Sequence, residues 1–329
     1  MKHVMSRLRG LSNLRGKASA QKNLALRPGL PSKTFSRSIS FTTFESKEEV
    51  SKVLKEKEAF IIDCDGVLYH GDIVLPGAKE FIDFLRNYNK KYCFLTNSSD
   101  RCPDQLAAKF NRIGLGAEPK DFYTSAMSTA TFLRLQKPSG SAYVVGEQSL
   151  VDALTAEGIR VVTAEEADAN TPEFVVFGET VSNETFNYEE ITTAVRLVRR
   201  GSRLVGTNED VADRHGEEMI PGTGALTRPV EAASGFGCYY LGKPNPFMIQ
   251  SALDRLEVGR EKACMVGDRM NTDIQAGVEA TVDTVLVLSG ISTMNTVLQY
   301  SFRPSTILHT VGDIASLCTD KVDSVELPH

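Results

Sequence analysis

From Ala59 onward, short apolar runs rich in β-branched residues alternate with amphipathic stretches of helical period. This alternation predicts an α/β fold in which a mostly parallel sheet is covered by helices on both faces. In such sheets, ligands bind beyond the carboxyl ends of the strands. The expected strands are Phe60–Cys64, Tyr92–Thr96, Ala142–Val145, Phe174–Phe177, Arg203–Thr207, Cys238–Leu241, Ala263–Val266 and Thr284–Leu288.

Two aspartates, Asp63 and Asp65, stand at the end of the first of these strands and are followed at once by Gly66. Side chains at positions i and i+2 of an extended strand point to the same face, so these two carboxylates are expected to emerge side by side. Carboxylates so close repel each other unless a cation or a shared proton relieves them. A solvated turn after the strand is the alternative to a reactive site.

Three further strand ends carry polar groups suited to phosphate or metal chemistry. The second strand ends in Thr96 and Asn97, whose hydroxyl, amide and free backbone N–H groups can hold phosphate oxygens, although a plain turn has the same composition. Lys243 directly follows a later strand and could neutralise both a carboxylate and a phosphate. Asp268 ends another strand, with Asp273 five residues on, and hard oxygen ligands of this kind suit Mg²⁺.

The first 44 residues contain nine Lys and Arg, several serines and no Asp or Glu. This composition is typical of an organellar transit peptide, which we expect to occupy residues 1–43. The arginine content favours a mitochondrial address over a plastid one. A basic tail on a cytoplasmic protein, bound to an acidic partner, is the alternative.

The rest of the chain is acidic and soluble in composition. Removing the nine basic leader residues from the 37 Lys and Arg leaves 28 against 42 Asp and Glu, a formal net charge of −14. A body this acidic repels a phosphate backbone, so nucleic acid is not expected as a partner. No apolar run approaches the ~20 residues that a membrane span requires, so no membrane association is expected either.

The four strand-end motifs, in this order, resemble those of the haloacid dehalogenase (HAD) superfamily of aspartate-nucleophile phosphotransferases. The resemblance runs from about Lys57 to Ile314. It implies a Rossmann-like, doubly wound parallel sheet core. Asp65 and Thr96 are too close in sequence to enclose a cap domain, whereas Asn97 and Lys243 are 146 residues apart. The expected organisation is therefore a core of residues 44–126 and 227–329, interrupted by an inserted α/β cap of residues 127–226.

Class IIA of this superfamily carries such a cap, and several runs are similar to its NagD-type branch. They are Phe122–Ala126, Tyr143–Glu147, Val205–Asn208 and Leu286–Gly290. Phosphoglycolate phosphatases and 4-nitrophenyl phosphatase-like enzymes share most of these landmarks. The resemblance implies a Mg²⁺-dependent phosphatase for small-molecule phosphate monoesters, with a nucleotide as the favoured substrate and phosphoglycolate or a broad aryl phosphatase range as the alternatives. A homodimer through the cap is a further expectation from resemblance.

The resemblance also implies a role for each motif residue. Asp63 is the nucleophile that becomes an aspartyl phosphate, and Asp65 is the general acid and base. The metal ligands are Asp63, the backbone carbonyl of Asp65, and Asp268. The remaining motif residues hold phosphate oxygens (Thr96, Asn97 and Lys243) or support the metal site from behind (Asp273).

Substrate recognition is expected from the cap. The polar residues Asn208, Glu209, Asp210 and His215 follow a predicted cap strand and are proposed to face the site, with a solvated surface loop as the alternative. Their acids would disfavour a substrate that carries a carboxylate, which favours a nucleoside monophosphate. Two other classes are weighed against a phosphatase. A phosphomutase typically needs a cap between the first two motifs, and a phosphate-sensing module would be expected to lack Asp63 or Asp65.

Overall fold

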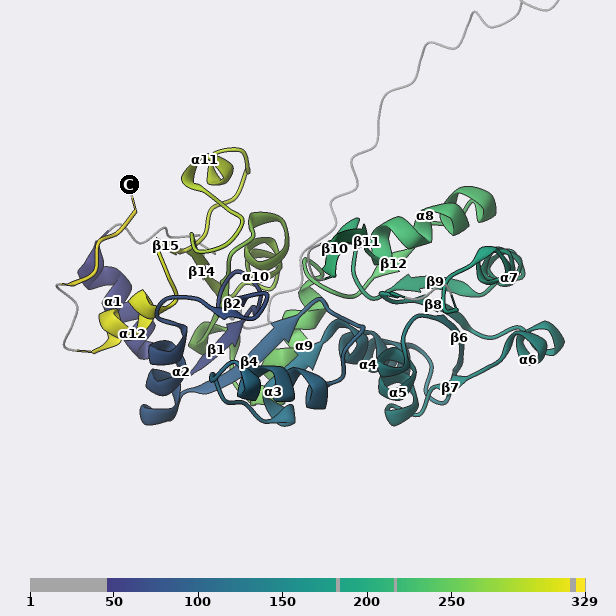
Figure 1. The fold of residues 1–329 in the computed structure, drawn as a ribbon, viewed down its shortest axis with the longest axis horizontal. Helices are drawn as coiled ribbons and strands as arrows, with labels where there is room; N and C mark the ends of the chain where they lie inside the picture. Colours follow the sequence, from purple (N-terminus) through teal and green to yellow (C-terminus); the bar gives the residue numbers. More distant parts are fainter. Residues whose placement is uncertain (1–45, 182–183, 216–217, 320–323, 329) are drawn as a thin grey trace, which may run out of the picture. The chain divides into compact units, whose positions relative to one another are not determined.

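The structure is a computed structural model that describes residues 46–181, 184–215, 218–319 and 324–328. The expected transit peptide, residues 1–43, therefore lies outside the described residues. Two parallel sheets dominate the fold, and both belong to one compact unit (Figure 1). Within the described residues, no helix combines the length and apolar character that crossing a bilayer demands.

The first sheet has six strands in the order β15-β14-β13-β1-β4-β5, all parallel. Its central strand is β1, which registers Ile62 against Val266 on one side and against Phe94 on the other. The strands are β1 (Ala59–Ile62), β4 (Lys91–Thr96), β5 (Phe122–Thr124), β13 (Ala263–Gly267), β14 (Asp283–Val287) and β15 (Thr306–Leu308). The predicted doubly wound parallel core is confirmed.

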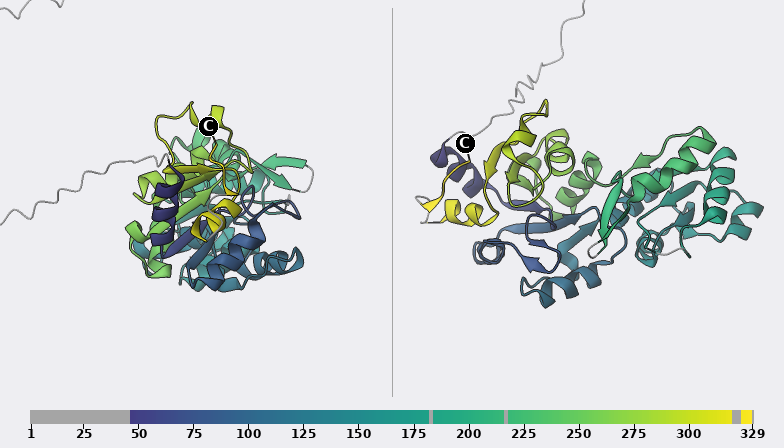
Figure 2. Two further views of the ribbon diagram at one scale, coloured as in Figure 1. Left: turned by 90° about the vertical axis from the view of Figure 1, so that its left-hand side faces the viewer. Right: turned by 45° about the horizontal axis from the view of Figure 1, so that its top comes forward.

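Helices cover both faces of this sheet because its strands are apolar on both sides (Figure 2). Within β1, Phe60 and Ile62 pack in one buried cluster, while Ala59 and Ile61 pack in the cluster on the opposite face. The first cluster lies under α1 (Lys47–Glu56), α2 (Ala78–Asn87), α3 (Pro103–Arg112) and α12 (Gly312–Cys318), and the second under α9 (Pro246–Leu256) and α10 (Gln275–Glu279).

The second sheet has five parallel strands in the order β12-β9-β8-β6-β7. They are β6 (Ser141–Val145), β7 (Arg160–Val161), β8 (Phe174–Phe177), β9 (Arg203–Gly206) and β12 (Tyr239–Tyr240). Helices α4 (Ser125–Gln136) and α5 (Gln148–Ala156) pack on one face, and α6 (Ala164–Ala169), α7 (Tyr188–Arg199) and α8 (Thr223–Ser234) on the other. The α/β insertion expected between Asn97 and Lys243 is this layer, called the cap below.

The cap sheet extends beyond the boundary at Leu226 that the sequence suggested. Strand β12 pairs with β9, with Tyr239 opposite Val205, and the Leu241 N–H donates to the Gly206 carbonyl. The run Cys238–Leu241 was expected to lie in the core because Lys243 follows it directly. The chain instead returns to the core between Leu241 and Lys243, which only Gly242 separates.

All eight expected strands are present, and the sequence missed only short ones. The additional strands are β5, β7 and β15, and two hairpins: β2 (Tyr69–His70) with β3 (Ile73–Val74), and β10 (Ala212–His215) with β11 (Glu218–Pro221). Runs of two to four residues are too short for a period-2 pattern to be recognised. The expected helix at Thr272–Val278 is a π-turn over Met270–Ile274 that leads into α10.

Candidate active site

Asp63 and Asp65 lie beyond the carboxyl end of β1 but do not share one environment. The Asp63 N–H donates to the Val266 carbonyl at 2.9 Å, which continues the β1–β13 ladder and directs the side chain into the fold. The Asp63 side chain is 14% exposed and that of Asp65 is 56% exposed. Asp65 Oδ1 lies 3.3 Å from His70 Nδ1 on the first hairpin. The predicted pair is thus one buried and one solvent-accessible carboxylate.

Lys243 is the buried cation of the site. Its side chain is 3% exposed, and its Nζ lies 2.5 Å from Asp63 Oδ1 and 2.8 Å from Asp273 Oδ1. The same ammonium donates to the Leu95 carbonyl at 3.3 Å. Burial alone lowers the pKa of Lys243, but Asp273 and Asp63 outweigh this effect and hold its pKa above the usual lysine value. Lys243 therefore remains a cation beside the nucleophile candidate.

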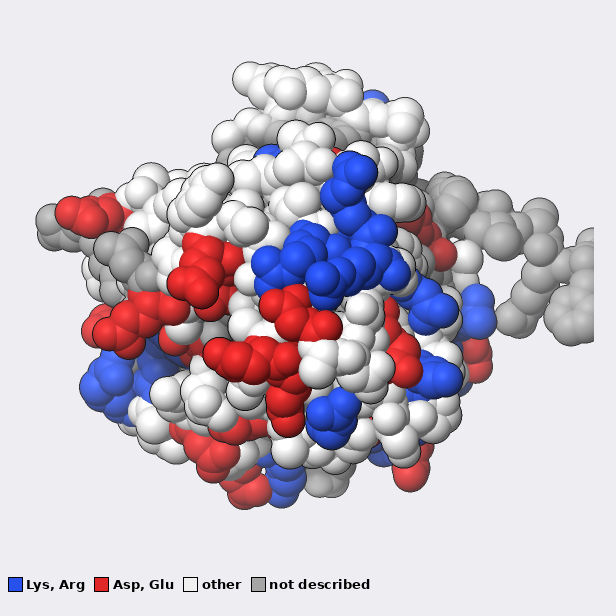
Figure 3. Space-filling view, turned by 90° about the vertical axis from the view of Figure 1, so that its right-hand side faces the viewer, with Lys and Arg blue, Asp and Glu red and all other residues white. Residues whose placement is uncertain are grey.

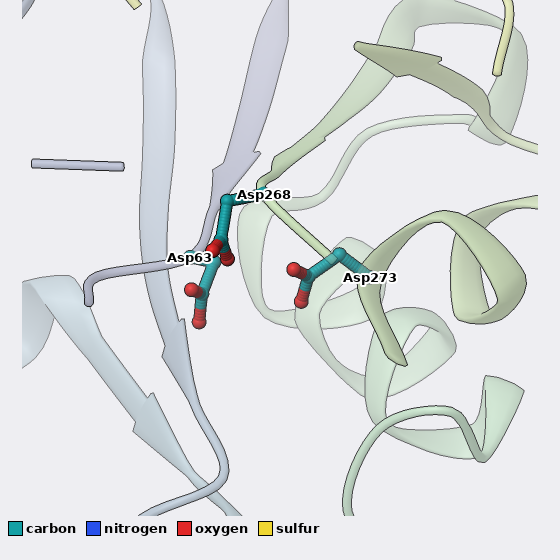
Figure 4. A group of neighbouring side chains, drawn as sticks. All are labelled: Asp63, Asp268 and Asp273. Carbon is teal, nitrogen blue, oxygen red and sulfur yellow. The ribbon is translucent and has the colours of Figure 1, made fainter. Parts of the chain in front are cut away.

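Asp63, Asp268 and Asp273 form a cluster in which one carboxylate oxygen of each lies within 4.8 Å of the others (Figure 4). Asp268 is 1% exposed. Its Oδ2 accepts from the Ile291 N–H at 2.7 Å, whereas its Oδ1 has no hydrogen-bond partner among the described residues. A buried carboxylate oxygen without a partner is costly, and a bound cation would satisfy it.

Glycines make the space that Asp268 occupies. A Cβ on Gly66 would lie 2.4 Å from Asp268 Oδ2, and one on Gly290 would lie 2.0 Å from the same atom. Gly66 also has φ +81°, in the left-handed region that side chains disfavour. The glycine that follows Asp65 in sequence is thus required both by its backbone conformation and by its contact with the carboxylate.

Burial and mutual repulsion raise the pKa of two members of the cluster. Burial raises the pKa of Asp63 to about 8, with Lys243 opposing the shift and Asp273 and Asp268 adding to it. Burial and then Asp273 raise the pKa of Asp268 to about 6. Three carboxylates face Lys243 and, at longer range, Arg269, so negative charge exceeds positive charge in the cluster. A divalent cation would remove that deficit and favour the ionised carboxylates.

The loop after β4 lies next to this cluster, but its side chains are not all free. The Thr96 hydroxyl accepts from the Ser98 N–H at 3.1 Å. The Asn97 amide clamps the lysine segment: its Oδ1 accepts from the Lys243 N–H at 2.8 Å, and its Nδ2 donates to the Lys243 carbonyl at 3.0 Å. Asn97 thereby positions Lys243. This contact was not part of its predicted role as a phosphate ligand.

Of the four predicted cap residues, Asp210 lines the cleft and accepts from Asn97 Nδ2 at 3.0 Å. Asn208 is fully buried and donates to the Asn97 carbonyl at 2.8 Å, so it joins cap to core and does not face a substrate. Glu209 is exposed, 4.0 Å from Arg228, and does not line the cleft. His215 ends β10, and its side chain lies outside the described part of the structure.

Glu179, which the sequence analysis missed, joins the same contact between cap and core. It follows β8 directly and is 5% exposed. Its Oε2 accepts from the Ser99 N–H at 2.7 Å, its Oε1 accepts from Asn208 at 3.0 Å, and its own N–H donates to Ser99 Oγ at 2.9 Å. Burial, with Asp213 and Asp100 nearby, raises the pKa of Glu179 well above the usual glutamate value. Its position at a strand end was the available signal.

These groups line one cleft of about 1480 Å³. The core contributes Asp63, Asp65, Lys243 and Asp268, and the cap contributes Asp210 and Asp213. Residues of α3 and of the first hairpin also line the cleft. A cleft of this size admits a small metabolite whose reacting group lies at the carboxylate cluster and whose remainder lies between cap and α3.

Comparison with known families agrees with this geometry. The model of the haloacid dehalogenase-like hydrolases matches residues 60–160, and the HAD-hydrolase-like model matches residues 240–314. The two matched segments carry both halves of the carboxylate cluster. The chain belongs to the haloacid dehalogenase superfamily. Within it, the cap and the relatives place the chain among the class IIA, NagD-type phosphatases, so it is a hydrolase of phosphoric monoesters.

Three relatives illustrate the range of this branch. Dihydroxyacetone phosphatase of Corynebacterium glutamicum is 41% identical over 262 residues, 80% of this chain and 92% of the relative. Acid sugar phosphatase of Staphylococcus saprophyticus is 33% identical, with 79% and 98% covered. Ribonucleotide monophosphatase NagD of Escherichia coli is 39% identical, with 77% and 96% covered. The solved NagD structure matches with a TM-score of 0.71 over 78% of this chain and 97% of NagD.

Proposed function

We propose that the protein hydrolyses small-molecule phosphate monoesters through an aspartyl phosphate on Asp63, with Mg²⁺ as cofactor. The observation that carries this proposal is the pairing of Asp63 with the buried Lys243 beside an Asp268 oxygen that lacks a hydrogen-bond partner among the described residues. A nucleophilic carboxylate, a fixed cation and a cation-binding carboxylate are the groups that phosphoryl transfer requires.

Asp63 and Asp65 divide the chemistry. The Asp63 carboxylate attacks phosphorus, the ester P–O bond breaks, and Asp65 donates a proton to the departing alcohol oxygen. Asp65 then takes a proton from water, which attacks the same phosphorus and releases inorganic phosphate and free Asp63. The exposure of Asp65 suits this exchange of protons with leaving group and solvent, whereas the buried Asp63 stays in place.

Asp63, the backbone carbonyl of Asp65, and Asp268 would hold the Mg²⁺. The unpartnered Asp268 oxygen and the excess of buried carboxylates fit a divalent cation. When bound, the ion supplies positive charge that lets an anionic nucleophile approach a phosphate. Asp273 lies against Lys243, so we assign it to holding that lysine, which together with the Thr96 hydroxyl and the loop backbone would hold the phosphate oxygens.

The deciding experiment is phosphate release from an aryl phosphate with Mg²⁺. Asp63→Asn should lower kcat by at least about 1000-fold, as expected when a nucleophile is removed. Asp104→Asn, which alters an exposed acid in the first turn of α3, should leave kcat unchanged. Magnesium-dependent turnover that survives Asp63→Asn would refute the assignment of the nucleophile.

The cap residues give only part of the information on the natural substrate. The argument for a nucleoside monophosphate rested on several cap acids near the leaving group. In the structure Asn208 is buried and Glu209 does not line the cleft, so among the predicted cap residues with described side chains only Asp210 supports that argument. The relatives act, by their names, on dihydroxyacetone phosphate, acid sugar phosphates and ribonucleotides. Other residues that line the cleft, from the core as well as from the cap, are therefore candidates for substrate choice.

A further inference from the structure

The α3 wall of the cleft carries three cations, Arg101, Lys109 and Arg112. Two of them have carboxylate partners: Arg101 Nε lies 3.6 Å from Asp100 Oδ2, and Arg112 Nη2 lies 2.9 Å from Asp72 Oδ1. Lys109 has no carboxylate within 4 Å in the described part of the chain. Lys109 therefore makes no direct ion pair among the described residues, although the charges of Asp65 and Asp72 act on it at longer range.

Some other basic side chains of the described residues are paired with acids. On the cap, Asp168 lies 2.9 Å from Arg196 and 3.1 Å from Arg200. The face drawn in Figure 3 shows basic side chains adjoining acidic ones. What distinguishes Lys109 is its place in the lining of the cleft beside Arg101.

The position of the Lys109 ammonium is fixed by Tyr69. Lys109 Nζ lies 3.7 Å from the centroid of the Tyr69 ring, a cation–π contact. Tyr69 is itself held, because it is 5% exposed and packs edge-on against Phe110 with ring centroids 5.6 Å apart. A lysine with a fixed, half-buried ammonium loses less side-chain entropy when it binds an anion than a free surface lysine does.

Tyr69 also ties the lysine to the catalytic loop. Its carbonyl accepts from the Gly66 N–H at 2.8 Å, and its backbone forms a bridge with Asp65. Lys109 is therefore connected through Tyr69 to the loop that carries Asp65. Burial and then the charge of Arg101 lower the pKa of Lys109, while the charges of Asp65 and Asp72 oppose this shift. Arg101 and Lys109 line the same cleft. An anion placed there would relieve their repulsion.

We propose that Arg101 and Lys109 form a second anion subsite that binds a carboxylate or second phosphate on the leaving alcohol of the substrate. This inference rests on the proposed function, because Asp65 marks where the leaving oxygen lies. The substrate class is then a phosphate monoester with a second anionic group, such as a phosphorylated hydroxy acid or a sugar bisphosphate. The positive charge of this subsite counteracts the negative charge of the cap acids in the cleft. One of these acids, Asp210, is already bonded to Asn97.

The test uses the full chain with Mg²⁺ and matched pairs of esters that differ in the second anion. Suitable pairs are 2-phosphoglycolate with 2-hydroxyethyl phosphate, 3-phosphoglycerate with glycerol 3-phosphate, and fructose 1,6-bisphosphate with fructose 1-phosphate. For at least one pair, the enzyme should prefer the anionic member. Lys109→Met should raise KM for that member about 10-fold and leave kcat and the neutral member unchanged.

Three controls make the result decisive. Lys109→Arg should retain the preference, and Lys120→Met, which removes an exposed lysine 2.7 Å from Glu118, should have no effect. An aryl phosphate reports the proposed hydrolysis alone and should be cleaved equally by all variants. A uniform loss on every ester in Lys109→Met, or a preference for neutral members in the unmodified enzyme, would overturn the subsite. No cleavage of any ester by the unmodified enzyme would instead overturn the proposed function.

Discussion

The behaviour of single residues in this site follows from how few alternatives their surroundings leave. Asp268 has one oxygen bonded to a backbone N–H and one without a hydrogen-bond partner among the described residues. Gly66 and Gly290 leave room for that carboxylate, which a Cβ at either position would displace. A cation bound to the second oxygen of Asp268 would supply the missing partner.

The first prediction concerns Asp268 and the metal. Asp268→Asn should weaken Mg²⁺ binding by at least about 10-fold, a loss seen even for residues that only orient metal ligands. The measurement is the Mg²⁺-dependent rise of the unfolding temperature, which reports binding without turnover. Asp104→Asn should keep the full rise. An unchanged rise in Asp268→Asn would rule out this carboxylate as a ligand. Chelation of the metal should abolish turnover, and added Mg²⁺ should restore it.

The second prediction separates backbone strain from contact at two glycines. Gly66 and Gly71 both have positive φ, but a Cβ at Gly71 would meet nothing within 4 Å. Both Gly66→Ala and Gly71→Ala should lose about 1–2 kcal/mol of unfolding free energy from the left-handed backbone. Gly66→Ala should also lose Mg²⁺ binding, because its Cβ displaces Asp268. Equal Mg²⁺ affinity in the two variants would show that the contact is not critical.

Residues at strand ends could be predicted from the sequence, and residues elsewhere could not. Asp63, Lys243 and Asp268 each follow an apolar run, and the parallel sheet collects such positions at one edge. Lys109 stands in the middle of an amphipathic helix, where a lysine is ordinarily solvated, so nothing in the sequence distinguishes it. The clamp that Asn97 places on Lys243 was also invisible, because it joins residues 146 apart.

At the scale of elements, the cap contacts the core through a small buried polar network. Glu179 and Asn208, from the ends of β8 and β9, bond the backbone of the loop that follows β4. That loop also carries Thr96 and the Asn97 clamp. The cap therefore helps to fix the loop that we propose to hold the phosphate, by bonding its backbone.

Glu179→Gln tests this role. The substitution keeps one acceptor but turns an amide toward the Asn208 amide, so we expect a fall in kcat of roughly 10-fold, about 1.4 kcal/mol, with KM little changed. Amide hydrogen exchange at Ser99 and Asp100 should become faster. Glu173→Gln is a matched control, because Glu173 accepts from the Ser141 N–H at 2.8 Å within the cap, away from the cleft. An equal effect on kcat in both variants would indicate general destabilisation.

The core and cap as elements were largely predictable because apolar strand runs are strong signals. The cap boundary was not, because β12 is two residues long and its pairing partner, β9, precedes it by more than thirty residues. Hydrogen bonding across that separation decides which sheet the strand joins. The composition of Cys238–Leu241 does not indicate which of the two sheets the strand joins.

At the scale of the whole molecule, the first described element is a helix with its own N-cap. Helix α1 opens at Lys47 with Ser46 as its cap, whose hydroxyl accepts from the Glu49 N–H at 3.2 Å. The elements that build the sheets and the cleft all come after it. We retain the proposal that residues 1–43 are a mitochondrial address, with no part in catalysis.

A chain that begins at Phe44 should therefore match the full chain in kcat, KM and unfolding temperature. Residues 1–43 fused to a fluorescent protein should direct it to mitochondria, and fluorescence spread through the cytoplasm would contradict the proposal. Plastid import in plant cells would support the alternative address. A loss of activity in the shortened chain would show that the leader contributes to the fold.

The short return of the chain from β12 to Lys243 restricts where caps can be exchanged between relatives. Exchanging caps between relatives is an obvious way to transplant specificity, with the junction placed where the core sequence resumes. Here the last cap strand, β12, ends only three residues before Lys243, which pairs with the proposed nucleophile Asp63. A chimera joined between β12 and Lys243 would combine the lysine of one parent with the edge strand of the other parent's cap. Functional chimeras should be those that take the segment from β12 through Lys243 from a single parent.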